Sequence, residues 1–139
     1  MFVKIIIIVF ILLETLNVLA LYFAPDSIYA NSVGIFTAWE KSKQYPEIHD
    51  LIKYLVNWVA GAKLIFLALL IIIVLFADLE IQRLSLIALA LATASFYWRL
   101  FPLIRRIDRS GMLRLKNYSL VLGGMIFVFI VVFLGGFIT

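Results

Sequence analysis

Four long runs of apolar residues dominate the pattern of hydrophobic and polar positions along this chain. The runs cover residues 5–24, 57–77, 84–104 and 118–138. Each is close to the roughly 20 residues that a helix needs to cross a hydrocarbon core about 30 Å thick. None alternates between apolar and polar residues as a membrane β-strand does, and four strands are too few to close a membrane barrel. The pattern therefore predicts one all-α domain, residues 1–139, built as a bundle of four transmembrane helices.

Residues near the ends of these runs predict two helix boundaries. The second helix is expected to begin near Pro46, before the membrane, because the helical spacing of apolar residues already includes Ile48 and Leu51. Pro102 lies near the end of the third run, and a proline inside a helix removes a hydrogen bond and produces a kink. We therefore expect a long second helix and a kinked third helix.

The first run also has features of a secretory signal peptide, with Lys4 as the basic residue before the apolar core. However, Glu14 interrupts the run, and the run is longer than the apolar core of a usual signal peptide. We therefore expect a membrane span that is retained in the protein.

Lysine and arginine are distributed unequally between the two sides of the predicted bundle. The connections on one side contain Lys41, Lys43, Lys53, Arg105, Arg106, Arg109, Arg114 and Lys116. The other side has only Lys4 and Arg83. Because cytoplasmic loops are enriched in lysine and arginine, we expect both termini to be extracytoplasmic. The protein is then an integral protein of the plasma or cytoplasmic membrane.

The connection after the first run has aromatic and apolar residues at helical spacing. They are Tyr29, Val33, Phe36 and Trp39. With Lys41 and Lys43 just beyond, this is the pattern of a short amphipathic helix that lies in the membrane surface. The alternative is a loop whose aromatic side chains contact the headgroups. In both cases Trp39, Lys41 and Lys43 are expected at the lipid headgroups.

The composition excludes a soluble domain. Apolar residues make up 65% of the chain and charged residues 14%, against about 45–50% and 25% in soluble domains. A soluble domain of this length would have to expose much of that apolar surface. The net charge of +4 favours an anionic lipid surface over nucleic acid as a partner. The absence of cysteine excludes disulfides and thiolate metal sites.

Residues able to carry out catalysis or to bind a cofactor are few. His49 is the only histidine, and a metal site there would need further ligands at one-turn spacing. Its neighbours Glu47 and Asp50 fit a solvated helix start, where the helix dipole favours acidic residues. The chain has no serine–histidine–acid set and no glycine-rich phosphate loop. We therefore expect no metal and no cofactor, and we favour a non-catalytic protein over an enzyme.

Five of the polar or charged residues inside the predicted spans, where burial in lipid is costly, are candidates for a common site. They are Glu14, Asn17, Lys63, Thr93 and Arg99. Counted at 1.5 Å per residue from the extracytoplasmic ends, they fall within a slab about 8 Å thick. Arg99 is the better expected partner of Glu14, because a guanidinium keeps its charge and binds a carboxylate with two hydrogen bonds.

This slab has three possible interpretations. Glu14 and a cation form an ion pair that fixes helix packing, or the two cations extend to the cytoplasmic headgroups while Glu14 is neutral. In the third interpretation, the residues form a site between helices for an ion, a proton or a lipid headgroup.

A glutamate midway along the first of four membrane helices resembles the small multidrug resistance transporters, in which that carboxylate exchanges protons for cationic drugs. The resemblance rests on Glu14 and on the number of helices. It implies a transport role for Glu14. This chain departs from the family in its long connection after the first run, its uneven charge distribution and the absence of glycine from residues 84–104.

Two further groups of residues are expected to make contacts. Arg105, Arg106 and Arg109 form a basic cluster at the expected cytoplasmic boundary, where it acts as a topology signal and suits anionic lipid or an acidic partner. The fourth run has two pairs of small residues that let another helix approach closely, within the bundle or from another chain. These residues are Gly123, Gly124, Gly135 and Gly136.

These observations favour a small non-catalytic integral membrane protein. It would be a subunit or helper that packs on other membrane proteins or on itself, as the glycines of the apolar fourth run suggest. The alternative is a small transporter or channel that uses Glu14 together with Lys63 or Arg99.

Overall fold

The computed structural model describes all 139 residues and contains no β-strand. Its helices are α1 (Phe2–Phe23), the 3-10 turn η1 (Val33–Ile35), α2 (Thr37–Ser42), α3 (Pro46–Phe76), α4 (Leu79–Ala94), α5 (Phe96–Arg109) and α6 (Tyr118–Ile138). Four helical segments are long and apolar enough to cross a membrane, namely α1, α3, α4 with α5, and α6. The predicted all-α fold with four spans is therefore present, and α3 begins at Pro46 as expected.

Local chemistry sets several of these helix ends. Pro46 occupies the first turn of α3, where its missing N–H has no intrahelical partner to lose. Asp78 begins α4 by accepting a hydrogen bond from the backbone N–H of Ile81 at 2.9 Å. Pro25 follows the end of α1 and cannot continue that helix.

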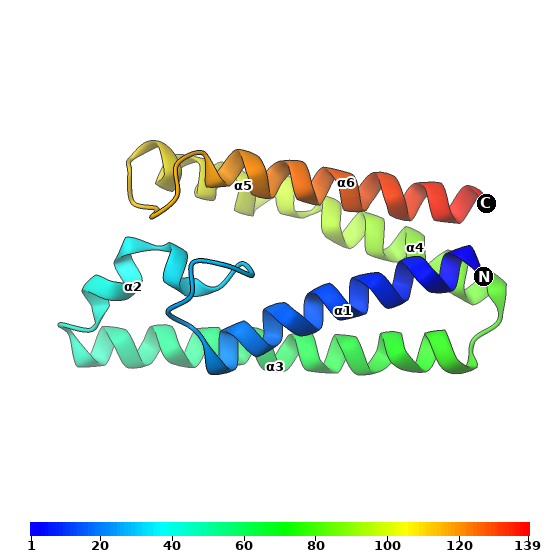
Figure 1. Ribbon diagram of the computed structural model, residues 1–139, viewed down its shortest axis with the longest axis horizontal. Coiled ribbons are helices and arrows are strands. Elements are labelled where there is room, and N and C mark those ends of the chain that lie inside the picture. The colour runs from blue at the N-terminus through cyan, green and yellow to red at the C-terminus, as the bar shows by residue number, and fades with distance from the viewer.

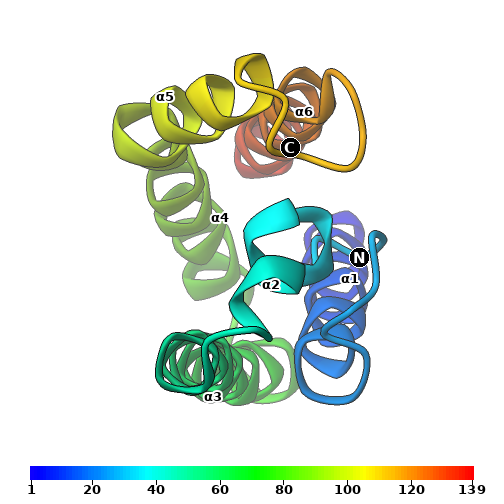
Figure 2. The same cartoon turned by 90° about the vertical axis from the view of Figure 1, so that its left-hand side faces the viewer.

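The helices form two pairs. Helix α1 packs along α3, and α6 packs along α4, as Figure 1 shows with the α1–α3 pair below the α4–α6 pair. Both chain termini and the α3–α4 turn lie at one end, which we call the terminal end. Residues 24–45 and 110–117 lie at the opposite end, which we call the loop end. Figure 2, viewed along the helices from the loop end, shows the two pairs on opposite sides of α2.

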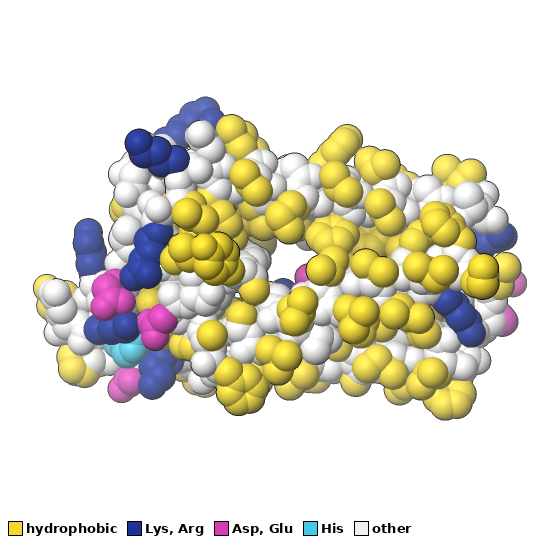
Figure 3. Space-filling model, viewed as in Figure 1, with side chains coloured by type: hydrophobic (Ala, Val, Ile, Leu, Met, Phe, Trp, Pro, Cys, Tyr) yellow, Lys and Arg dark blue, Asp and Glu magenta, His cyan; other side chains and the backbone are white.

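The main apolar core lies toward the terminal end, where the two pairs meet. Val3, Ile7 and Phe10 of α1 are buried there with Leu86 of α4 and Phe133 of α6. The ring of Phe10 meets the ring of Phe133 edge to face, with centroids 5.1 Å apart. Outside this core, large apolar side chains cover the exposed surface of the helices (Figure 3), as contact with lipid requires.

The third span departs from the expected single helix, residues 84–104 with a kink at Pro102. The direction changes at Ser95 instead, and Pro102 lies inside α5. The Ser95 N–H shares the carbonyls of Leu91 and Ala92, and its hydroxyl donates to Ala92 at 2.6 Å, which tightens the last turn of α4. Figure 2 shows that α5 then runs across the bundle toward α6.

The expected amphipathic surface helix over Tyr29–Trp39 is not confirmed. A turn at Ala30 and Asn31, with φ of 54° and 52°, is followed by η1 and the six-residue α2. The left-handed backbone of these two residues cannot continue a right-handed helix. Trp39 points into the protein and is only 3% exposed, so the expected headgroup contact of Trp39 is wrong. Its indole N–H donates instead to Asp26 at 2.6 Å, a tertiary contact that helical spacing alone does not reveal.

The two connections at the loop end bind each other. Phe36 and Leu113 form an isolated antiparallel bridge. On either side of it, the Thr37 N–H donates to the Met112 carbonyl at 3.1 Å and the Arg114 N–H donates to the Ile35 carbonyl at 2.9 Å. The helix pairs are thus joined at the loop end by backbone hydrogen bonds and at the terminal end by the core. Between these two junctions, α1 and α6 are separated by a pocket.

Candidate functional site

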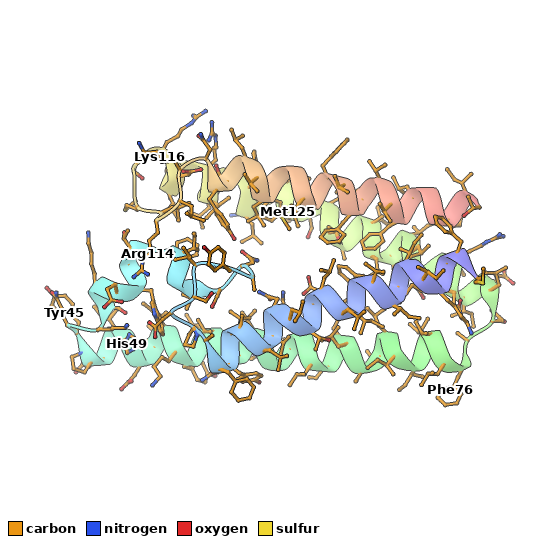
Figure 4. The ribbon with its side chains drawn as sticks, viewed as in Figure 1. Tyr45, His49, Phe76, Arg114, Lys116 and Met125 are labelled. Carbon is orange, nitrogen blue, oxygen red and sulfur yellow. The ribbon has the colours of Figure 1, made fainter.

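A pocket of about 550 Å³ lies in this separated region, between α1 and α6, and we call it the α1–α6 pocket. The space-filling view in Figure 3 shows the opening between the two helix pairs. Most of the lining is apolar, with Leu13 and Leu16 on α1 facing Leu122, Met125 and Ile126 on α6. Figure 4 labels Met125 beside this opening. The pocket is therefore suited to a hydrocarbon group.

Aromatic side chains close the pocket toward the terminal end. Phe129 lines the pocket and also packs on the core, with its ring centroid 5.6 Å from that of Phe10 and 6.1 Å from that of Phe133. These contacts join the pocket wall to the main apolar core. The depth of the pocket is therefore fixed by the core.

The α1 side of the pocket has a polar cluster formed by Glu14, Asn17 and Lys63. The Lys63 ammonium lies 2.7 Å from a Glu14 carboxylate oxygen and donates to the Asn17 side-chain oxygen at 2.6 Å. Glu14 and Asn17 both line the pocket, whereas Lys63 approaches from α3. The Lys63 ammonium thus pairs with two hydrogen-bond acceptors, which would be unfavourable if they were left unpaired in an apolar wall.

Asn17 also ties this cluster to the loop end. Its side-chain amide donates to the carbonyls of Ala30 and Asn31, at 2.5 and 3.2 Å. The two carbonyls belong to the left-handed turn that interrupts the expected surface helix. Asn17 is only 7% exposed, and its amide uses both its donors and its acceptor. The conformation of the turn is therefore coupled to the polar cluster.

The structure brings together three of the five expected intramembrane residues. Arg99 lies elsewhere, on the exposed side of α5, with its guanidinium carbon 5.2 Å from the centroid of the Trp98 ring. Thr93 lies on α4 and is half-buried. The expected preference for Arg99 over Lys63 as partner of Glu14 is wrong, because the turn at Ser95 carries Arg99 out of the bundle.

The rim of the pocket at the loop end contains polar residues that the sequence did not place in a common site. The Tyr118 hydroxyl donates to the Asn31 side-chain oxygen at 2.7 Å, and both residues line the pocket with Lys116. Lys116 is exposed and has no ion-pair partner, so its charge faces the rim unmatched. Asn31 and Tyr118 are 87 positions apart, and no local pattern relates them.

The four glycines of α6 separate into two inward and two outward positions. A side chain on Gly123 would meet the Phe101 ring of α5, and one on Gly136 would meet Ile6 and Leu86. Nothing lies within 4 Å of the corresponding positions on Gly124 and Gly135. Close packing inside the bundle therefore uses one glycine of each pair.

Most of the other basic residues lie at the loop end in different settings (Figure 4 labels Arg114 and Lys116). Lys43 binds Asp26 at 2.8 Å and Glu40 at 2.9 Å. The hydrogen bond from Lys43, and then that from Trp39, lowers the pKa of Asp26, while the bond to Asp26 raises the pKa of Lys43. Lys41 is exposed and unpaired, so it is free to contact headgroups.

His49 belongs to this loop-end network. Figure 4 shows it near the start of α3, where its Nδ1 lies 2.8 Å from the Ser42 hydroxyl and its ring lies 4.6 Å from the Trp39 ring. The Ser42 hydroxyl donates to the Trp39 carbonyl at 2.7 Å, so His49 Nδ1 is the donor in its own contact with Ser42. His49 therefore helps to dock α2 on α3.

Comparisons with protein-family models, with curated proteins and with solved structures find no match to this chain. They give no support to the resemblance to the small multidrug resistance transporters. A function must therefore be inferred from the residues of the α1–α6 pocket and of the surface.

Proposed function

We propose that the protein is a small non-catalytic integral membrane protein, a subunit or helper, that binds one membrane amphiphile in the α1–α6 pocket. The pocket itself carries this proposal, because its volume of about 550 Å³ falls within the range of about 300–1,000 Å³ that small-molecule sites occupy. Its walls are apolar, and its polar groups are few and placed at specific points. This combination is typical of sites that hold a largely hydrocarbon ligand in one orientation.

The distribution of polar groups indicates how an amphiphile would lie. Its headgroup would lie at the rim, near Lys116 and Asn31, and its hydrocarbon part would follow α6 toward Phe129. The residues from Tyr118 to Phe129 rise about 17 Å along α6, which suits a chain reaching from the interface toward the bilayer centre. The Glu14–Lys63 pair would border the hydrocarbon part without adding net charge.

Native mass spectrometry of the full chain purified in a mild detergent tests this proposal. We expect wild type to retain one bound amphiphile that Met125→Trp loses, because the indole would occupy the pocket. Leu120→Trp is the matched control, since Leu120 lies on the same helix, is 50% exposed and does not line the pocket. The proposal is wrong if wild type retains no amphiphile, or if the two tryptophan variants retain equal amounts.

The outward side of α6 supports the helper role. Gly124 and Gly135 lie 11 residues apart, close to three full helical turns, so they share one face. Small residues on an exposed helix face let a second membrane helix approach closely. Cross-linking from cysteines at these two positions, in membranes, is expected to capture a second membrane protein or a second copy of this chain. A single uncross-linked species would contradict the helper role.

Transport is a second candidate, because the Glu14 carboxylate lines a pocket while its charge is balanced by Lys63. Proton-coupled transport would exchange a proton for a cationic ligand at the Glu14 carboxylate. The test is proton movement into vesicles that contain the purified chain, with tetraphenylphosphonium as the cation and an enclosed pH-sensitive dye. Transport predicts a cation-driven pH change that Glu14→Gln abolishes. An unchanged pH would contradict transport and leave amphiphile binding as the function.

A further inference from the structure

Helix α5 has an inner side that packs on α6 and an outer side rich in arginine. On the inner side, Phe101 contacts Gly123, the Tyr97 hydroxyl donates to the Gly123 carbonyl at 2.5 Å, and Ile104 is buried. Arg99, Arg106 and Arg109 are exposed on the other side of the helix, whereas Arg105 lies on the flank and donates to Ser119 of α6. This division makes α5 the strongly amphipathic helix of the chain, in place of the one expected after α1.

One flank of α5, between its inner and outer sides, has a shallow depression at its C-terminal half. A groove of about 660 Å³ is lined by Phe101, Pro102, Arg105, Arg106, Arg109 and Ser110, and we call it the arginine groove. Three guanidinium groups and two apolar side chains thus border one concave surface. The groove is separate from the α1–α6 pocket, with which it shares no lining residue.

The positive charge of the arginine groove is not balanced within the protein. Asp108 is the only acidic residue on α5, and its carboxylate accepts hydrogen bonds from the N–H and hydroxyl of Ser119, at 2.9 and 2.5 Å. Arg105 lies 3.9 Å from that carboxylate and donates to the Ser119 hydroxyl at 3.2 Å. Arg106 and Arg109 form no ion pair. At least two guanidinium charges therefore remain for an external anion.

We propose that the arginine groove binds the phosphate of an anionic membrane lipid. Guanidinium groups bind phosphate oxygens in pairs, with charge-assisted hydrogen bonds. A lipid is favoured over a soluble anion by the neighbouring side chains, because Trp98 is 76% exposed and Leu100 is 58% exposed on the same helix. Exposed tryptophan and leucine beside arginine are typical of a helix at the boundary between headgroups and hydrocarbon.

The test measures lipid binding to the full chain in detergent micelles, with added dioleoyl-phosphatidylglycerol or dioleoyl-phosphatidylcholine. We expect wild type to bind the anionic lipid about 10-fold more tightly than the zwitterionic one, a factor close to the lower limit for a single charge-assisted hydrogen bond. Arg106→Gln with Arg109→Gln is expected to remove that preference. Both residues are exposed, and unchanged helical circular dichroism would show that the variant is folded.

Lys4→Gln with Lys53→Gln is the matched control, because it removes the same charge from exposed residues outside the groove. This control and Met125→Trp are both expected to keep the preference for the anionic lipid, so the outcome does not depend on the α1–α6 pocket. Three results would overturn the proposal. They are equal binding of the two lipids, an equal loss in the lysine control, and competition by inorganic phosphate at the same concentration as the lipid, which would indicate a soluble anion.

Discussion

The ammonium nitrogen of Lys63 lies 2.7 Å from a carboxylate oxygen of Glu14, and this contact joins α3 to α1 within their apolar spans. The side chains are 28% and 23% exposed, so lipid and protein replace most of the water that would solvate either charge alone. Each charge is therefore stabilised chiefly by the other, because an isolated charge in such surroundings is costly. The pair fixes the position of α1 relative to α3 beside the pocket.

Breaking this pair from one side should destabilise the fold more than removing both charges. Lys63→Ala leaves Glu14 without its cation, and we expect it to lower the free energy of unfolding by about 2 kcal/mol, between the values for buried pairs in soluble proteins and for polar contacts in membranes. Adding Glu14→Gln should recover part of that loss, because the stranded charge is then gone. The free energies of unfolding of wild type, Lys63→Ala, Glu14→Gln and the double variant form a double-mutant cycle. They are measured in mixed micelles with increasing dodecyl sulfate.

The matched control replaces Arg99, which contacts neither residue of the pair. Losses from Arg99→Ala and Glu14→Gln should simply add, since distant sites behave independently. If the stability losses from Lys63→Ala and Glu14→Gln also simply add, the Glu14–Lys63 contact does not stabilise the fold.

Much of the fold could be predicted from apolar runs, because a long run specifies a span without reference to its neighbours. The early start of α3 followed in the same way from helical spacing after Pro46. The turn at Ser95 could not be predicted, since the apolar run continues through it and the cause is a local hydrogen bond to Ala92. That single turn also decides which cation reaches Glu14, because it places Arg99 on the outside.

The loop end illustrates the limit of periodicity for the site. Trp39 has the spacing of a lipid-facing residue, yet its indole binds Asp26 and its ring contacts His49. Asn31 accepts a hydrogen bond at the rim of the pocket from Tyr118, which is far from it in the sequence. Both outcomes depend on tertiary contacts between segments whose spacing in the sequence carries no information about them.

Gly34→Ala should disrupt the connection after α1. A methyl group at Gly34 would collide with the backbone carbonyls of Asp26 and Ser27, which cannot rotate away as a side chain does. The same glycine donates its N–H to the Pro25 carbonyl at 2.7 Å, so the close approach is part of the native loop. We expect a loss of about 1–3 kcal/mol in the same unfolding assay. Gly124→Ala, whose methyl meets nothing, should be neutral, and an equal loss there would contradict the steric explanation.

The two glycines near the end of α6 should respond differently to alanine. A methyl group at Gly136 would collide with Ile6 and Leu86, which both belong to the main core. Overpacking of this kind destabilises a fold by about 1–3 kcal/mol. A methyl at Gly135 meets no atom within 4 Å. Gly135→Ala should therefore leave stability unchanged or raise it slightly through helix propensity. Equal melting temperatures for the two variants would refute the predicted packing of Gly136.

Lowering the pH should destabilise the packing of the loop end by protonating Asp26. The pKa of Asp26 is lowered from 3.8 in the folded protein. Its contribution to stability is therefore present at pH values above 3.8 and is lost as the pH falls through the lowered pKa. The pKa of Lys43 is raised from 10.5, so its contribution is lost only at pH above that value. The fluorescence of Trp39, measured with Trp58 and Trp98 replaced by phenylalanine, should change as the pH falls below 3.8. Asp26→Asn should show no such change, and an identical profile in that variant would exclude Asp26 as the cause.

The orientation in the membrane can be tested at the two ends of the bundle. Both termini lie together at the terminal end, while Arg114 and Lys116 lie at the loop end with most of the other basic residues (Figures 1 and 4). Because lysine and arginine are retained on the cytoplasmic side, the loop end should be cytoplasmic and the termini outside. A fusion after Thr139 to a reporter that is active only outside should be active, and the same reporter inserted after Gly111 should be inactive. Gly111 suits the insertion because it is exposed in a turn and an added side chain there meets no atom within 4 Å. The reverse result would invert the topology and place the arginine groove in the outer leaflet, whereas activity at both positions would show insertion in two orientations.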